Sequence, residues 1–154
     1  MPTVTPTAQT VREKREHACR FFEHCWRTGR LDTELVTEEY RAFGLPGGPH
    51  DIDTAQAAID AVRNAIPNLR VVVRAVICEG DFASIRFGAQ GTQTGDLAGV
   101  SGDGDELTTD GVVTYAFENG RIAESRLYLD VPSLLCGRSD SVSSGDSVSS
   151  VQSP

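Results

Sequence analysis

Three side chains of the kinds that move protons and stabilise negative charge alternate near the end of RIAESRLYLD, residues 121–130. The segment reads as a β-strand, so Arg126, Tyr128 and Asp130 would share one face. Carboxylates act as acids and bases, and a phenol or guanidinium can stabilise an oxyanion beside it. A purely structural interpretation stays open: a turn-capping aspartate before a proline, a buried tyrosine with a satisfied hydroxyl, and an arginine reaching solvent.

The dipeptide Asn119-Gly120 separates this strand from an earlier alternating segment and is a strong hairpin signal. A two-residue turn would place these opposite pairs on one face: Phe117 with Ile122, Tyr115 with Glu124, Val113 with Arg126, and Gly111 with Tyr128. Asp130 would lie on that face beside Thr109, and Leu127 and Leu129 would lie on the other. Neither face is purely polar, so the alternation leaves open which one lines a cavity.

Helical spacing in the first half of the chain gives way to alternation in the second. The predicted helices span residues 8–28, 32–39 and 53–65, with a Gly- and Pro-rich loop at 43–50. The predicted strands span residues 69–78, 82–92, 106–118 and 121–131. Helices followed by an antiparallel meander make an α+β domain, and a curved sheet over helices leaves a cavity inside its curve.

Composition and charge indicate one acidic globular domain. The chain has 154 residues and a net charge of −8, and its Lys and Arg residues form no cluster, which argues against a nucleic-acid partner. No apolar run reaches membrane-spanning length and the N-terminus lacks a signal-peptide core, so no membrane partner is expected and the location is predicted to be cytoplasmic. The domain is predicted over residues 8–136, between a flexible start at 1–7 and a disordered Ser-rich tail at 137–154.

The sequence predicts no metal site. Its four cysteines lack CxxC or other metal-binding spacing and read as reduced, packed thiols. His17 and His24 lie seven residues apart on a predicted helix, whereas zinc ligands on a helix are typically four apart, as in HExxH.

Five short motifs follow one another in the second half of the chain. They are Pro-x-Leu at 67–69, Glu-Gly-Asp at 79–81, Gly-Thr-x-Thr-Gly at 91–95, Asn-Gly-Arg-Ile at 119–122 and Asp-x-x-x-Leu-Leu at 130–135. As an ordered set, covering about residues 66–135, they resemble the SnoaL-like polyketide cyclase family of the nuclear transport factor 2-like superfamily. The resemblance implies a cone-shaped α+β barrel, with N-terminal helices packed on a curved antiparallel sheet that encloses a pocket.

The resemblance implies a cofactor-independent cyclase that closes a ring in a polyketide-like small molecule by intramolecular aldol condensation. Asp130 matches the family's acid–base aspartate. Tyr128 and Arg126 are added on their own chemistry, since two residues along a strand span roughly 6 to 7 Å and one substrate can touch both ends. The residues expected to bind substrate are Tyr115, Phe117 and Val113 on the Asp130 face, Trp26 on the first helix, and His50 in a loop at the mouth of the cone.

Two departures from the family leave the substrate and the reaction open. Gln93 stands where the family commonly has histidine, and Arg126 stands where tryptophan is frequent. The alternatives are an epoxide hydrolase, isomerase or dehydratase on the same scaffold, and a non-catalytic ligand-binding or dimerisation module. With Leu127 and Leu129 expected on the outer face of the sheet, a homodimer or homotetramer is also predicted.

Overall fold

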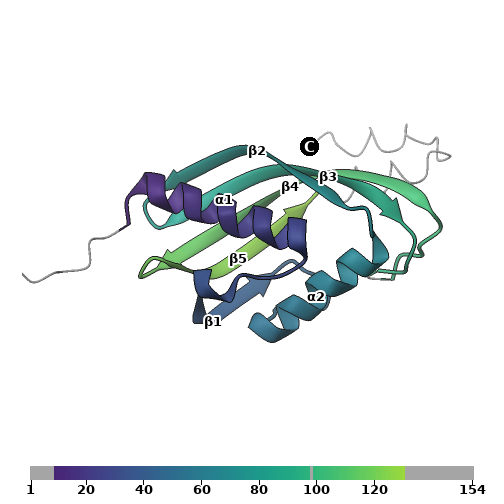
Figure 1. Cartoon of the computed structure of the whole chain (residues 1–154), viewed down its shortest axis with the longest axis horizontal. Helices are drawn as coiled ribbons and strands as arrows, with labels where there is room; N and C mark the ends of the chain where they lie inside the picture. Colours follow the sequence, from purple (N-terminus) through teal and green to yellow (C-terminus); the bar gives the residue numbers. More distant parts are fainter. Residues whose placement is uncertain (1–8, 98, 131–154) are drawn as a thin grey trace, which may run out of the picture.

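Two helices pack on one face of a five-stranded sheet (Figure 1). The computed structural model describes residues 9–97 and 99–130, so the segments predicted to be flexible at 1–7 and disordered at 137–154 lie outside the described residues. The elements in chain order are α1 (Val11–Thr28), the 3-10 turn η1 (Thr33–Leu35), β1 (Val36–Phe43), α2 (Ile52–Ala65), β2 (Arg70–Glu79), β3 (Phe82–Gln93), β4 (Asp105–Glu118) and β5 (Arg121–Leu129).

The strands lie in the order β1-β5-β4-β3-β2, so the sheet is open, with β1 and β2 at its edges. Strands β2 to β5 form the predicted antiparallel meander, whereas β1 runs parallel to β5. The predicted α+β cone is therefore confirmed, with a mixed and unclosed sheet in place of an all-antiparallel one.

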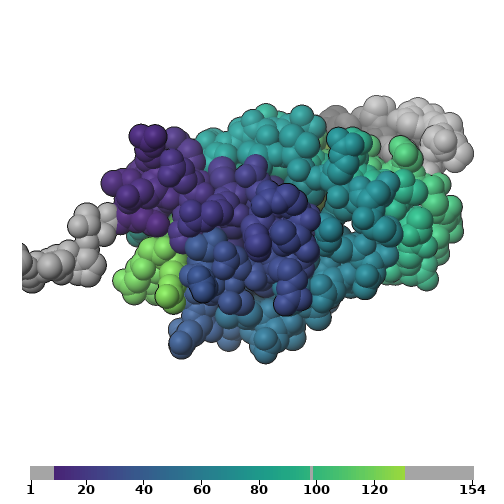
Figure 2. All heavy atoms as spheres, in the orientation of Figure 1, coloured from purple at the N-terminus to yellow at the C-terminus, as the bar shows by residue number. Residues whose placement is uncertain are grey.

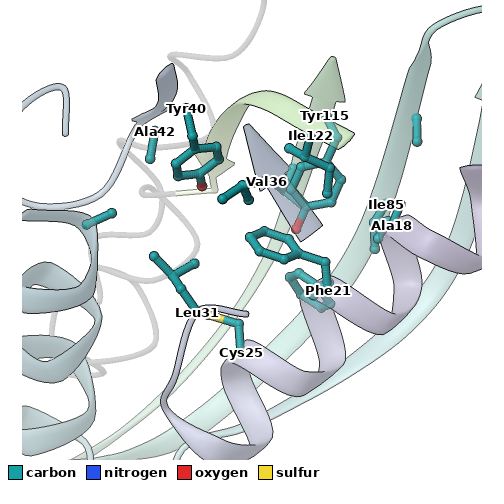
Figure 3. Packing of buried hydrophobic residues seen from close by; sticks show 14 of the residues in the cluster. Ala18, Phe21, Cys25, Leu31, Val36, Tyr40, Ala42, Ile85, Tyr115 and Ile122 are labelled. Carbon is teal, nitrogen blue, oxygen red and sulfur yellow. The ribbon is translucent and has the colours of Figure 1, made fainter. Parts of the chain in front are cut away.

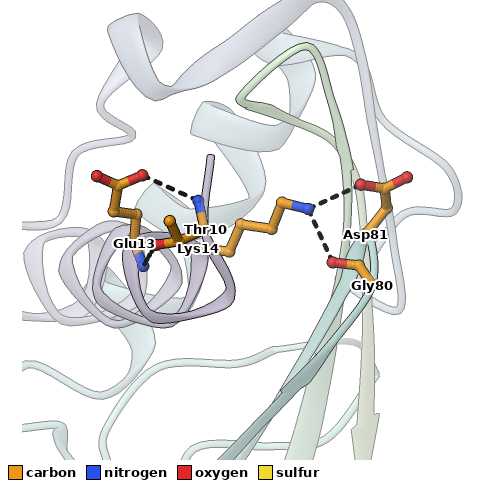
Figure 4. A network of polar contacts seen from close by, with 5 residues as sticks. All are labelled: Thr10, Glu13, Lys14, Gly80 and Asp81. Atoms are coloured by element: carbon orange, nitrogen blue, oxygen red, sulfur yellow. Dashed lines mark hydrogen bonds and ion pairs between the residues drawn. The ribbon is translucent and has the colours of Figure 1, made fainter. Parts of the chain in front are cut away.

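Helix α1 begins and ends at residues whose chemistry specifies those positions. Thr10 accepts a hydrogen bond from the Glu13 backbone N–H while the Glu13 carboxylate accepts one from the Thr10 N–H, and Gly29 ends the helix at φ 80°. Lys14 then donates to the Gly80 carbonyl at 2.8 Å and to the Asp81 carboxylate at 2.9 Å (Figure 4). These contacts fix the start of α1 over the turn between β2 and β3.

The helix predicted over residues 32–39 is wrong beyond its first turn. Only Thr33–Leu35 is helical, and Val36–Phe43 forms β1. Val36 and Tyr40 are each 2% exposed, and the strand pairs with β5, more than eighty residues further along the chain. A partner so distant leaves no signal in the local spacing, which is why the segment reads as helical in isolation.

The predicted hairpin register is right at the turn and wrong beyond it. Phe117 pairs with Ile122 as expected, but Ala116 pairs with Glu124, so Ala123 is an extra residue in β5. Such a bulge reverses the face of every later side chain on the strand. Leu127 therefore lies opposite Val113, and Tyr128 lies opposite Val112.

Aromatic side chains fill the core between α1 and the sheet (Figure 3). Phe21 meets Tyr115 edge to face at 5.6 Å between ring centroids, and Phe22 packs on Phe87 at 5.0 Å. The Tyr40 hydroxyl and the Ser125 hydroxyl share a buried hydrogen bond of 2.6 Å, and burial raises the pKa of Tyr40 to about 12. In Figure 2 the purple atoms of α1 lie over this part of the sheet.

Within the described residues, neither helix has the length and apolar character that a membrane crossing would require.

His17 is a buried imidazole between α1 and the entry to β1. It is 7% exposed, its Nε2 lies 3.2 Å from the Leu35 carbonyl, and its ring meets Phe117 edge to face. Desolvation lowers the pKa of His17, against the opposing effect of the hydrogen bond to Leu35.

This lowered pKa predicts that acidification destabilises the protein. As the pH falls through the unfolded-state pKa of about 6.5, the unfolded chain takes up a proton that the folded chain does not, so the unfolded state gains stability. We expect the free energy of unfolding to fall between about pH 7.5 and 5, and the His17→Gln variant to show a shallower decline in urea titrations. Equal pH slopes for the two proteins would contradict this assignment.

Candidate functional site

A cavity of about 440 Å³ lies between the helices and the covered face of the sheet. This volume falls within the range of pockets that hold small organic ligands. The wall is built from the end of α1 (Trp26), the loop after β1 (Leu45, Pro46), α2 and the residue that caps its end (Val62, Ile66), the sheet (Val71, Phe87, Ala89, Leu107, Leu127, Leu129) and the loop between β3 and β4 (Leu97, Val100). The cavity is therefore mostly apolar and draws on nearly every element of the fold.

Few polar side chains reach this wall, and among the described residues none of them is ionisable. They are Gln90, Gln93 and Thr109. Gln93 is 2% exposed, and its amide nitrogen donates to the carbonyls of Gly95 and Val100, each at 2.9 Å. The single hydrogen of the Thr109 hydroxyl is shared between the carbonyls of Asp110, at 3.2 Å, and Asp130, at 3.3 Å. Such a wall favours a neutral ligand, because an ion would lose its water without gaining an opposite charge.

The three residues predicted to be catalytic do not line this cavity. Arg126 pairs with Glu124 and lies 4.2 Å above the Phe43 ring, on the face of the sheet away from the helices. Tyr128 is 56% exposed on the same face, opposite Val112. Asp130 follows the last residue of β5 and is exposed, and its backbone N–H donates to the Asp110 carbonyl at 3.0 Å. The bulge at Ala123 is the cause, since it turns Leu127 and Leu129 to the covered face instead.

The residues predicted to bind substrate divide into three groups. Trp26 lines the cavity. Tyr115, Phe117 and Val113 are 3%, 7% and 5% exposed and belong to the core beside α1, where burial holds the pKa of Tyr115 well above its usual value. His50 is buried behind the wall, with its Nε2 2.8 Å from the carbonyl of the lining residue Pro46.

Several lining residues were missed because they are unremarkable as single letters. Strict alternation from the turn puts Leu127 and Leu129 on the opposite face, and Phe87 and Val100 belong to no motif. The signal that was present is the apolar character of Leu127 and Leu129, which favours the shifted register once one face must be dry.

Metal binding has no visible basis in the part of the chain that the structure describes. Over residues 9–97 and 99–130, no three His, Cys, Asp or Glu side chains gather in an arrangement that could hold an ion.

Comparisons with known proteins agree with this fold. A family model described as SnoaL-like polyketide cyclase matches residues 16–136. A candidate SnoaL-like polyketide cyclase from Jannaschia sp. CCS1 superposes with a TM-score of 0.73 at 23% identity, over 90% of this chain and 98% of that one. TsrD from Streptomyces laurentii gives 0.70 at 22% identity, over 81% and 96%. IdmH, a candidate polyketide cyclase from Streptomyces antibioticus, gives 0.66 at 20%, over 80% and 97%. A search of curated proteins finds no match.

Proposed function

The chain belongs to the SnoaL-like polyketide cyclase family, and from this premise we propose that it closes a ring in a neutral, largely apolar, oxygenated small molecule held in the cavity. The observation that carries the proposal is the cavity itself, with about 440 Å³ of space and a predominantly apolar wall. Ring-forming substrates of the polyketide type match it, because they combine apolar area with a few carbonyl and hydroxyl groups.

The wall also supports a restriction on the charge of the substrate. No ionisable side chain among the described residues lines the cavity, so a free carboxylate on the ligand would be desolvated without a counter-charge. Esters, lactones and ketones of the same skeleton avoid that cost. We therefore propose that the substrate enters as a neutral species.

Asp130 is the proposed acid–base residue. The Asp130 side chain is exposed and does not line the cavity, so its support is the match to the family's acid–base aspartate and one backbone contact, between its carbonyl and the hydroxyl of the lining residue Thr109. In the reaction, the carboxylate would remove a proton from a methylene between two carbonyls. The enolate carbon would then attack the carbon of a third carbonyl in the same molecule. The resulting alkoxide would take the proton back from the carboxylic acid. Tyr128 and Arg126 stay predictions, because their side chains lie on the outer face of the sheet.

The Asp130→Asn variant tests this role. We expect it to bind substrate like the wild type and to lose about a hundredfold or more in turnover, because asparagine cannot accept the proton. Trp26, the chain's one tryptophan, lies in the wall, so its fluorescence reports binding separately from turnover. The matched control is Asp110→Asn, which removes a neighbouring exposed carboxylate. The bond from the Asp130 N–H to the Asp110 backbone carbonyl is kept in this variant. Equal turnover in Asp130→Asn and the wild type would exclude the aspartate mechanism.

One observation favours a second function, in which the chain only binds its ligand. The wall that the structure describes contains no side chain able to transfer a proton at neutral pH. In that case a panel of neutral polyketides would change Trp26 fluorescence, no product would form, and Asp130→Asn would behave as the wild type does. The same wall gives little support to epoxide opening by two carboxylates and an arginine.

We also propose that the chain forms a homodimer through the outer face of its sheet. The prediction that Leu127 and Leu129 form the contact is wrong, because both line the cavity. Other apolar side chains are exposed on the outer face: Ile77, Phe82 and Tyr128 are 67%, 63% and 56% exposed. Sedimentation analysis at micromolar concentration should show a dimer that the double variant Ile77→Asp, Phe82→Asp converts to monomer. A monomeric wild type would remove this proposal.

A further inference from the structure

The loop between β3 and β4 supplies part of the cavity wall. Residues 94–97 and 99–104 of this loop are described, and Leu97 and Val100 from it line the cavity. Leu97 and Val100 exchange backbone hydrogen bonds of 3.0 and 2.9 Å, which pairs these two residues, the tip of the loop, in an antiparallel bridge. This pairing links the backbones that carry the two lining side chains.

Backbone contacts attach the base of the loop to its surroundings. The N–H groups of Thr94 and Gly95 donate to the Ala65 carbonyl at the end of α2, at 2.8 and 3.1 Å. The N–H of Gly104 donates to the Gln93 carbonyl at 2.8 Å, and Gly102 approaches the Gly95 backbone so closely that a Cβ on Gly102 would collide with it. These contacts fix the base, but none of them reaches Val100 at the tip.

The Gln93 side chain makes the connection between base and tip. It is 2% exposed, and its two amide N–H groups are directed at the carbonyls of Gly95 and Val100, each at 2.9 Å. Because the amide nitrogen carries two hydrogens, it can bond the Gly95 and Val100 carbonyls at the same time, whereas a hydroxyl has only one hydrogen to donate. Gln93 also lines the cavity, so it stands between the ligand space and the loop.

We propose that Gln93 is a positioning residue that holds Leu97 and Val100 in the cavity wall and thereby sets how tightly the cavity binds its ligand. The inference rests on the proposed function only in taking the cavity as the ligand site. It requires no step of the ring-closing reaction.

The test measures binding of 1-aminoanthracene, a neutral fluorescent aromatic probe, with Trp26 fluorescence as the second signal. In the Gln93→Leu variant both amide donors are lost, and we expect the dissociation constant to rise about tenfold or more. Gln93→Glu has nearly the same shape but, when ionised, donates nothing to either carbonyl. We expect it to bind weakly at neutral pH and to recover part of the affinity as acidification protonates the buried carboxylate, a pH response absent from the wild type.

Asn68→Leu is the matched control. The Asn68 amide also makes two hydrogen bonds, accepting from the Thr92 N–H at 2.7 Å and donating to the Thr92 hydroxyl at 3.2 Å, but Asn68 does not line the cavity. A merely structural loss of two bonds would affect both variants alike. We expect the control to keep the wild-type dissociation constant within about twofold.

A folded Gln93→Leu protein that binds the probe as the wild type does would overturn the inference. Should that variant fail to fold, Gln93→Glu decides the matter: affinity that rises on acidification supports the inference, and binding that is equally tight at every pH overturns it. Because none of these measurements needs turnover, a protein that binds the probe but forms no cyclic product would defeat the proposed reaction and leave the role of Gln93 intact.

Discussion

Replacing Phe22 with alanine should lower the free energy of unfolding by about 3 to 5 kcal/mol, the usual cost of emptying a buried aromatic site. Phe22 is 2% exposed on α1, and its ring lies against Phe87 on β3. Phe87 also lines the cavity, so neighbours that relax into the vacated space would alter the ligand site as well. Urea titration measures the loss as a lower transition midpoint at constant m-value.

The same substitution at Phe82 is the control for Phe22→Ala. Phe82 is 63% exposed, so its truncation should cost less than about 1 kcal/mol. Both variants are compared at submicromolar concentration, where association through the outer face contributes little. Similar losses for the two variants would contradict the packing of α1 on β3.

Replacing Gly44 with alanine should be similarly severe, for a reason that involves the backbone. Gly44 has φ 96°, and an added Cβ would collide with the Leu127 carbonyl, which belongs to β5 and cannot move freely. Positive φ costs a non-glycine residue about 1 to 3 kcal/mol, and overpacking against fixed atoms adds about 1 to 3 kcal/mol more. Because Gly44 and Leu127 both line the cavity, the variant should also bind ligand more weakly.

Gly48→Ala separates these two contributions. Gly48 has nearly the same backbone angle, φ 95°, but an added Cβ meets nothing within 4 Å. It should therefore show the strain without the collision, and keep wild-type ligand affinity. If thermal and urea unfolding show the same loss of unfolding free energy for both variants, the collision expected between an added Cβ at position 44 and β5 does not occur.

Local chemistry was enough to predict most of the secondary structure. The Asn119-Gly120 turn and the alternation of β2 to β5 act over a few residues, and each leaves a readable pattern. Strand β1 left none, because its main partner is β5 at the other end of the domain. The parallel pairing is stabilised by tertiary contacts such as the Tyr40–Ser125 hydrogen bond, which no window of neighbouring residues contains.

The sequence indicated that a cavity exists but not which β5 residues line it. The helices and the curved sheet implied a cavity, and Trp26 lies in the wall of the one observed. The identity of the β5 residues in its wall depended on one unpaired residue, Ala123, which has neither glycine nor proline beside it to mark a bulge. Counting from the turn therefore placed Arg126 and Tyr128 on the wrong side of the sheet.

Strand β5 thus encodes two different surfaces in a single stretch of nine residues. With Ala123 present, Leu127 and Leu129 line the cavity; with strict alternation from the turn, Arg126 and Tyr128 would line it instead. In evolutionary terms, gaining or losing one codon at the Ala123 bulge would exchange an apolar cavity wall for a charged one in a single event. Point substitutions would need several steps to do the same, each passing through a mismatched interior.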